Sequence, residues 1–267
     1  MLVLVLNGPA PAAEMGIAAA RRAFAEGAFV QAAELAHTAG GAEGAALAAR
    51  AELVYGDYLA PVSERYQNFI RAEADARRAI ALAPGDPEGH LCLALALGLI
   101  SREKGSLVAH FAGYAKEARL HIDLARRLAP GSAWGEALLG GWNLEIVRAG
   151  GIVGSLFYGA SLEAGMAAYA RAFARDPVNV SIAYQYAVQI VALGETPHRA
   201  EATRRLAVSL DRDVPADALA RLAHERAMRL MGALQARDDA AVRAIMRAEL
   251  GTVDGRDVRP AIGAGRR

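Results

Sequence analysis

Apolar residues recur three to four positions apart along most of the chain, which is the spacing of amphipathic helices, and strand-like alternation is nearly absent after residue 6. Gly, Pro, Ser and Asp residues interrupt this spacing at regular intervals. The pattern predicts six antiparallel helical hairpins. Their paired helices are expected to cover 13–26 with 28–40, 42–59 with 62–83, 86–101 with 105–129, 132–149 with 160–175, 178–193 with 196–211, and 215–235 with 238–250.

One signature occurs three times: an amphipathic helix end rich in Ala and Arg, then a proline, then a new helix start. The prolines that end the three copies, Pro84, Pro130 and Pro177, lie 46 and 47 residues apart. A period of about 20–50 residues is typical of repeat arrays, and a helix-then-proline unit is typical of stacked helical hairpins. We therefore predict an all-α fold, an α-solenoid of about six hairpins over residues 14–250.

Capping residues stand where the predicted helices begin and end. N-cap side chains are expected at Ser132, Ser161, Asp238 and in the pairs Asp86-Pro87 and Thr196-Pro197, where proline occupies the first helical position. Helix ends are expected at the glycines Gly194 and Gly150-Gly151. Periodicity is lost over residues 251–267, which we predict to be a disordered tail.

Composition excludes some classes of function. With 30 basic and 29 acidic residues the net charge is +1, whereas nucleic-acid binders usually carry a strong basic excess, so no nucleic-acid partner is expected. No stretch reaches the ~18–20 apolar residues needed to cross a bilayer, so no transmembrane segment is expected. A single cysteine, Cys92, excludes an internal disulfide and lies in an apolar run, where it is expected to be a small buried residue.

The first 13 residues leave the cellular location open. Met1–Leu6 is apolar and is followed by Ala10-Pro11-Ala12-Ala13, which resembles the second half of a signal peptide, but the charged start of such a peptide is missing. Residues 1–13 are therefore either a truncated signal peptide, which implies a periplasmic protein, or a disordered N-terminus, which implies a cytoplasmic one.

The repeats resemble the tetratricopeptide repeat (TPR), in which small residues stand where two helices cross and proline ends the second helix. The large-then-small pairs Leu93-Ala94, Leu139-Gly140 and Tyr186-Ala187 match its first helix. Small residues of its second helix are matched by Ala118, Ala125, Ala164 and Ala172. The resemblance covers residues 13–250, is strongest over 66–195, and implies a right-handed solenoid that binds other molecules.

The period is longer than the usual ~34 residues of this repeat. The extra length falls within hairpins, at 101–114 and 149–161. This lengthened repeat and the segments 140–145 and 157–161 resemble two extended-repeat groups. One is the regulator-of-microtubule-dynamics family, and the other is the TPR component associated with bacterial TRAP transporters. The second group implies a periplasmic protein, which forms oligomers in some cases and has a cavity for a hydrophobic ligand.

Chemistry-bearing motifs are scarce. His110 and His121 would lie ~16 Å apart on one helix, too far for one metal ion. Gly150–Ser155 lacks the strand and lysine of a phosphate-binding loop, and no Gly-x-Ser-x-Gly elbow is present. We therefore expect no catalytic residue, no metal and no cofactor.

The best candidate site is a cluster of aromatic and polar side chains, since tryptophan and tyrosine suit ligand or peptide contacts. Its predicted members are Trp134, Trp142, Asn143, Glu145, Arg148, Tyr158, Tyr184 and Gln185. The alternative is that these residues fill gaps between hairpins.

The sequence therefore predicts a non-catalytic binding or scaffold protein. Its expected partner is a protein or peptide, with a small apolar ligand as the alternative, and the protein could form oligomers. A periplasmic accessory of a TRAP-type transporter is the second hypothesis. An enzyme is the third, although it would require clustered titratable groups that the sequence does not show.

Overall fold

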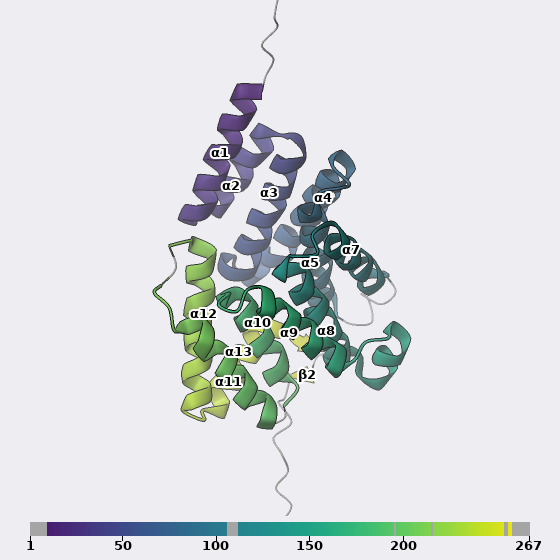
Figure 1. Ribbon diagram of the computed structural model, residues 1–267, viewed down its shortest axis with the longest axis vertical. Coiled ribbons are helices and arrows are strands. Elements are labelled where there is room, and N and C mark those ends of the chain that lie inside the picture. The colour runs from purple at the N-terminus through teal and green to yellow at the C-terminus, as the bar shows by residue number, and fades with distance from the viewer. Residues whose placement is uncertain (1–9, 106–111, 195, 215, 254–255, 258–267) are drawn as a thin grey trace, which may run out of the picture. The chain divides into compact units, whose positions relative to one another are not determined.

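The computed structural model describes residues 10–105, 112–194, 196–214, 216–253 and 256–257 (Figure 1). The chain divides into two compact units, residues 1–96 and 97–267. The helices are α1 (Ala10–Glu26), α2 (Phe29–Ala39), α3 (Gly41–Val54), η1 (Tyr55–Leu59), α4 (Val62–Leu82), α5 (Pro87–Lys104), α7 (Tyr114–Leu128), α8 (Ala133–Tyr158), α9 (Leu162–Arg175), α10 (Val180–Ala192), α11 (Thr196–Leu210), α12 (Ala218–Gln235) and α13 (Asp239–Leu250). The all-α prediction is confirmed.

Predicted and observed helices differ in three places. Residues 105, 112 and 113 fall in the helix predicted over 105–129 but are not helical, and α7 begins at Tyr114, after Gly113 with its left-handed φ of 73°. The helix predicted over 42–59 ends its α-helical part at Val54 and continues as one π-helical turn, η1. The segment predicted as an insert at 149–161 is largely helical, because α8 resumes after a break at Gly151 and runs to Tyr158. Gly151 has φ 56° and ψ −150°, a conformation that favours glycine, so the predicted helix stop is real.

In the first unit, consecutive helices pack side by side: α1 on α2, α2 on α3, and α3 on α4. Their contact surfaces are made largely of alanine. A Cβ on Gly44 would lie 2.5 Å from the carbonyl oxygen of Ala36, so α2 and α3 approach closely only because residue 44 is glycine. The alanines that are fully buried in this core are Ala20, Ala32, Ala36, Ala48, Ala49, Ala51, Ala72 and Ala76.

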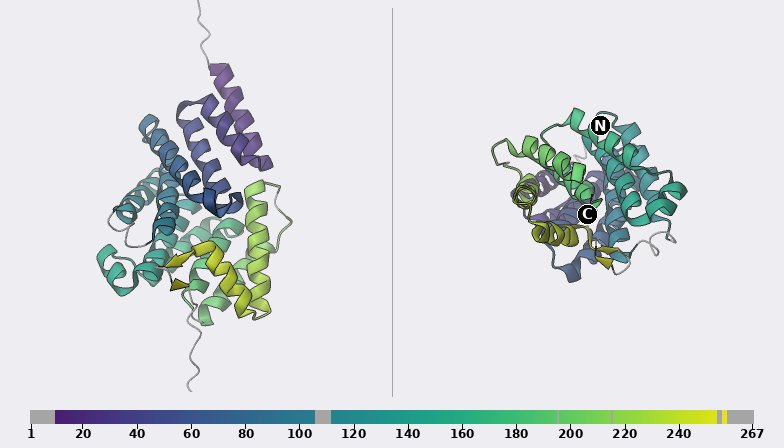
Figure 2. Two further views of the ribbon diagram at one scale, coloured as in Figure 1. Left: turned by 180° about the vertical axis from the view of Figure 1, so that it is seen from behind. Right: turned by 90° about the horizontal axis from the view of Figure 1, so that it is seen from below.

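In the second unit, three hairpins stack: α8 with α9, α10 with α11, and α12 with α13 (Figure 2). Helix α10 also contacts α8 and α12, so the first helices of successive hairpins form a continuous layer. Helix α10 is buried along most of its length, which explains its continuous apolar sequence. The hydroxyl of Tyr169 on α9 donates to Gln189 Oε1 on α10 at 2.8 Å and joins two hairpins.

Most predicted caps are confirmed. Ser132, Ser161 and Asp238 accept backbone N–H groups of the following turn, and Asp86 accepts from Glu88 N at 2.9 Å. Asn179 and Asp217 cap α10 and α12 in the same way, which the sequence analysis did not predict. Gly194 has φ 84°, as expected for a residue that ends a helix. The side chains of Thr196 and Pro197 lie outside the described part of the chain.

Both predicted terminal segments fall mostly outside the described residues. Residues 1–9 are not described, and α1 begins at Ala10. In the predicted tail, Thr252–Val253 (β1) pairs antiparallel with Arg256–Asp257 (β2), and residues 254–255 and 258–267 are not described. No helix in the described ranges has the length and apolar character needed to cross a membrane.

Two Gly→Ala variants test the close approach of α8 and α9. A Cβ on Gly140 would lie 2.5 Å from Tyr169 Cδ2, so Gly140→Ala should lower the free energy of unfolding by about 1–3 kcal/mol, as overpacking does. Gly98 lies in the interior of α5 with open space around a Cβ, so Gly98→Ala should raise it by about 0.5–1 kcal/mol. Urea unfolding measures both, and equal effects would show that the Gly140–Tyr169 contact is wrong.

Candidate functional site

Trp142 lies where the middle of α8 meets α7. Its side chain is buried, and its indole Nε1 donates to the carbonyl oxygen of Ala115 at 2.8 Å. The guanidinium of Arg119 lies 5.0 Å from the indole ring, and the ring of Tyr158 meets it edge-on with centroids 6.2 Å apart. The structure thus brings two of the predicted site residues, Trp142 and Tyr158, into contact.

Asn143 and Glu145 make contacts within the same region. Asn143 is buried, donates to Leu139 O at 2.9 Å and accepts from Ser161 N at 3.2 Å, which fixes the start of α9 against α8. Arg148 Nε donates to Glu145 Oε2 at 3.1 Å. Burial raises the pKa of Glu145, but the charges of Arg148 and Arg102 outweigh it and hold the pKa below its ordinary value.

The remaining predicted members are spread more widely. Trp134 is partly exposed near the start of α8. Tyr184 is fully buried on α10, and its neighbour Gln185 is partly buried. The part of these residues in binding stays a prediction, while the buried positions of Trp142, Asn143 and Tyr184 show that they also hold helices together.

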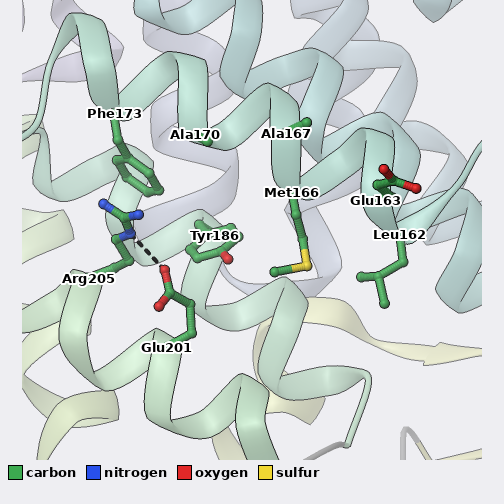
Figure 3. A pocket seen from close by; sticks show the side chains of 9 residues that line it. All are labelled: Leu162, Glu163, Met166, Ala167, Ala170, Phe173, Tyr186, Glu201 and Arg205. Atoms are coloured by element: carbon green, nitrogen blue, oxygen red, sulfur yellow. Dashed lines mark hydrogen bonds and ion pairs between the residues drawn. The ribbon is translucent and has the colours of Figure 1, made fainter.

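A groove lies between α9 and α11, with α10 beneath it (Figure 3). Its volume is about 630 Å³. Tyr186 of α10 lies between the two walls. At one end of the groove the guanidinium of Arg205 lies against the ring of Phe173, 4.6 Å from the centre of that ring. The complete lining is Leu162, Glu163, Met166, Ala167, Ala170, Phe173, Tyr186, Glu201 and Arg205. Most of this surface is apolar.

Charged groups mark the two ends of this groove. At one end Arg205 Nε donates to Glu201 Oε1 at 2.8 Å, and at the other end Glu163 is exposed. Burial raises the pKa of Glu201, but hydrogen bonds from Arg205 and Arg204 outweigh it and lower the pKa. Burial raises the pKa of Tyr186 to about 12, so its phenol is neutral at physiological pH. The sequence alone does not reveal this groove, because its lining comes from three helices and has no local motif.

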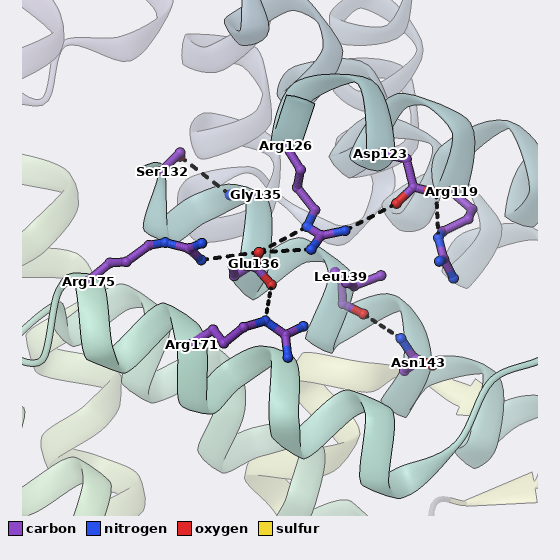
Figure 4. Close-up of polar contacts among 10 residues, drawn as sticks. All are labelled: Arg119, Asp123, Arg126, Ser132, Gly135, Glu136, Leu139, Asn143, Arg171 and Arg175. Carbon is purple, nitrogen blue, oxygen red and sulfur yellow. Dashed lines mark hydrogen bonds and ion pairs between the residues drawn. The ribbon is translucent and has the colours of Figure 1, made fainter. Parts of the chain in front are cut away.

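Glu136 of α8 holds α9, which is one wall of the groove, through ion pairs with two arginines of α9 (Figure 4). Its carboxylate is only 5% exposed and accepts from Arg126 of α7 at 2.9 Å and from Arg171 and Arg175 of α9 at 2.9 and 3.1 Å. Burial raises the pKa of Glu136, but hydrogen bonds and charges of Arg126 and Arg171 outweigh it and lower the pKa. One carboxylate therefore joins α7, α8 and α9.

The last turns of α8 carry large apolar side chains in contact with solvent. Beyond the break at Gly151, Ile152, Val153 and Leu156 are about 80% exposed and Phe157 is 55% exposed; we call these four residues the apolar tip. The ammonium of Lys116 lies 4.8 Å from the centre of the Phe157 ring. Side chains so exposed add little to the stability of the fold.

One group of side chains in the first unit has the composition of a metal site. His37 of α2, Glu52 of α3 and Asp75 of α4 place one ligand atom each within 4.8 Å of the others. His37 Nε2 lies 2.6 Å from Asp75 Oδ2, and Arg71 Nε lies 3.5 Å from Glu52 Oε1. Burial and the charge of Asp75 raise the pKa of Glu52 to about 8, against the opposing charge of Arg71. The members are 15 and 23 residues apart, so no short motif could reveal them.

Comparison with known proteins shows which solved structure this fold is similar to. No protein-family model matches the chain, and no curated protein matches it. The crystal structure of a thermophilic TPR protein in Thermus thermophilus superposes with a TM-score of 0.57 over 81% of this chain and 98% of that one, at 17% sequence identity. The fold is TPR-like. This likeness supports the general resemblance to TPR proteins and says nothing about the two extended-repeat groups.

Replacing Glu136 tests its role as the anchor of α9. Glu136→Gln leaves three guanidinium groups without their shared anion, so the free energy of unfolding at pH 7 should fall by about 3 kcal/mol. Because the folded-state pKa is lowered, the stabilisation is complete above the ordinary pKa of 4.5 and is lost as pH falls through the folded-state pKa. Unfolding measured from pH 8 downward should show a constant difference between the two proteins above pH 4.5 and a shrinking one below it. Glu163→Gln, exposed on the same helix as Arg171 and Arg175, should stay within about 0.5 kcal/mol throughout. A difference between Glu136→Gln and the unmodified chain that stays constant as the pH falls below 4.5 would contradict this role.

The apolar tip should be dispensable for folding. Replacing Ile152, Val153 and Leu156 together with glutamine should leave the Tm nearly unchanged, because these side chains are already about 80% exposed. The same variant should elute earlier from a hydrophobic-interaction column. Ile182→Gln serves as the comparison, since Ile182 is fully buried and its replacement should unfold or strongly destabilise the chain. A large fall in Tm for the triple variant would show that the tip is packed.

Proposed function

We propose that the chain is a non-catalytic, TPR-like binding protein whose groove between α9 and α11 holds an amphipathic helix of a protein partner. The groove is the observation that carries this proposal. Its volume of about 630 Å³ falls within the ~300–1,000 Å³ of typical binding pockets, and its walls are two helices over an apolar floor. Amphipathic helices bind in such grooves through apolar side chains spaced three, four and seven residues apart.

The lining suits such a partner in three respects. Ala167 and Ala170 leave space between the helices, and Met166 is a flexible side chain that adapts to different apolar shapes. Exposed Glu163 at one end favours a basic residue beside the apolar stripe of the partner. The walls are folded before binding, and Glu136 holds α9 in place, so little conformational entropy is lost in forming the complex.

The TRAP-transporter alternative predicts a different occupant for the same groove, a small apolar solute, together with export to the periplasm. The apolar lining favours this alternative as a second function. Titration with a small apolar fluorescent probe, 1-aminoanthracene, separates the two occupants: a solute-binding groove should bind the probe tightly and leave helical peptides unbound.

Filling the groove tests the proposal. Helical peptides should first be selected by display on the full chain, and their affinities then measured by calorimetry. Ala170→Trp places an indole in the groove and should weaken the selected peptides at least 10-fold. Ala207→Trp is the matched control, because Ala207 is an exposed alanine of α11 outside the lining, and it should bind peptides like the unmodified chain. Equal affinities for both variants would place the binding site elsewhere.

A further inference from the structure

We propose that His37, Glu52 and Asp75 bind a divalent transition-metal cation, with Zn²⁺ as the metal that fits best. Each ligand comes from a different helix, so one cation would cross-link α2, α3 and α4 of the first unit. Imidazole nitrogen and carboxylate oxygen are ordinary Zn²⁺ ligands at about 2.0–2.2 Å. The three ligand atoms lie within 4.8 Å of one another, so small side-chain adjustments bring them to that range.

A buried carboxylate oxygen of Glu52 points to a cation at this site. Its side chain is 7% exposed, and its Oε2 is buried with no hydrogen-bond partner among the described residues. Leaving a buried carboxylate oxygen without a partner is costly, and a second carboxylate, Asp75, lies beside it. A cation between the two carboxylates satisfies the oxygen and removes their repulsion together.

The surroundings favour an exchangeable site. The side chain of His37 is 42% exposed, so the cation could enter from solvent, and three protein ligands leave a fourth position for water. The guanidinium of Arg71 is the one adverse charge that the described contacts place at the site. This guanidinium also donates to Asn68 Oδ1, and the side chain of Arg71 is 51% exposed, so it can turn away from the site toward solvent. The nitrogen ligand favours Zn²⁺ over Mg²⁺, which prefers oxygen ligands and retains its water.

A proton shared between Glu52 and Asp75 is the competing explanation of the same geometry. It would also remove the repulsion between the two carboxylates, but it would require no metal and no part for His37. The two explanations therefore differ in whether the folded chain binds a cation and whether binding needs all three side chains.

The test is calorimetric titration of ZnCl₂ into the full chain after treatment with EDTA. We expect one ion per chain, with affinity reduced at least 10-fold in His37→Ala and Glu52→Gln. His224→Ala, which removes a partly exposed histidine of α12, should bind like the unmodified chain. Co²⁺ in place of Zn²⁺ should give a visible absorption band that is lost in both site variants.

A thermal measurement makes the result independent of any single variant. Zn²⁺ should raise the Tm of the unmodified chain and of His224→Ala, and should leave that of Glu52→Gln and of Asp75→Asn unchanged, because a ligand that binds only the folded state stabilises it. Absence of Zn²⁺ binding to the unmodified chain would overturn the proposal in favour of the shared proton. Binding that survives in Glu52→Gln with undiminished affinity would also overturn it, because the cation would then be held elsewhere.

Discussion

Close contact between helices through alanine and glycine sets the geometry of this protein. At Gly44, Gly140 and Gly165 an added Cβ would lie 2.5–2.7 Å from an atom of a neighbouring helix, so these positions have no room for a side chain. Small residues at a contact bring the axes of two helices together and let larger residues reach across to a third. Tyr169 does this: its ring lies against Gly140 of α8, and its hydroxyl bonds to Gln189 of α10. The groove walls are fixed because the hairpins behind them are packed in this way.

The positive charge of this chain is carried almost entirely by arginine. Of the 30 basic residues only two are lysines, and many of the described arginines form ion pairs within the chain. The planar guanidinium can donate to two acceptors at once, as Arg126 does between Asp123 and Glu136. Arginine greatly outnumbers lysine in the sequence. The structure adds a physical use for it, since a point charge such as lysine could not join α7 and α8 in the same geometry.

The sequence was sufficient to predict the helices, because periodicity, caps and glycine stops are local. Asp86, Ser132, Ser161 and Asp238 cap helices where their positions in the pattern require it. The surfaces that could bind other molecules were harder to predict, because each combines side chains from several helices. The groove needs α9, α10 and α11 together, and the His37–Glu52–Asp75 group needs α2, α3 and α4. For Trp142, the sequence left open whether the side chain packs between helices or contacts a ligand. Only the structure shows that its indole lies against α7.

The two tryptophans give the protein a built-in optical reporter. Trp134 and Trp142 lie near the start and the middle of the same helix, one partly exposed and the other buried against Tyr158 and Arg119. A polar quencher such as iodide should reach the first indole more easily than the second. Tyr158 is the last residue of α8 and contacts the indole of Trp142. A molecule that binds beside Tyr158 should therefore shift the fluorescence emission of the unlabelled protein.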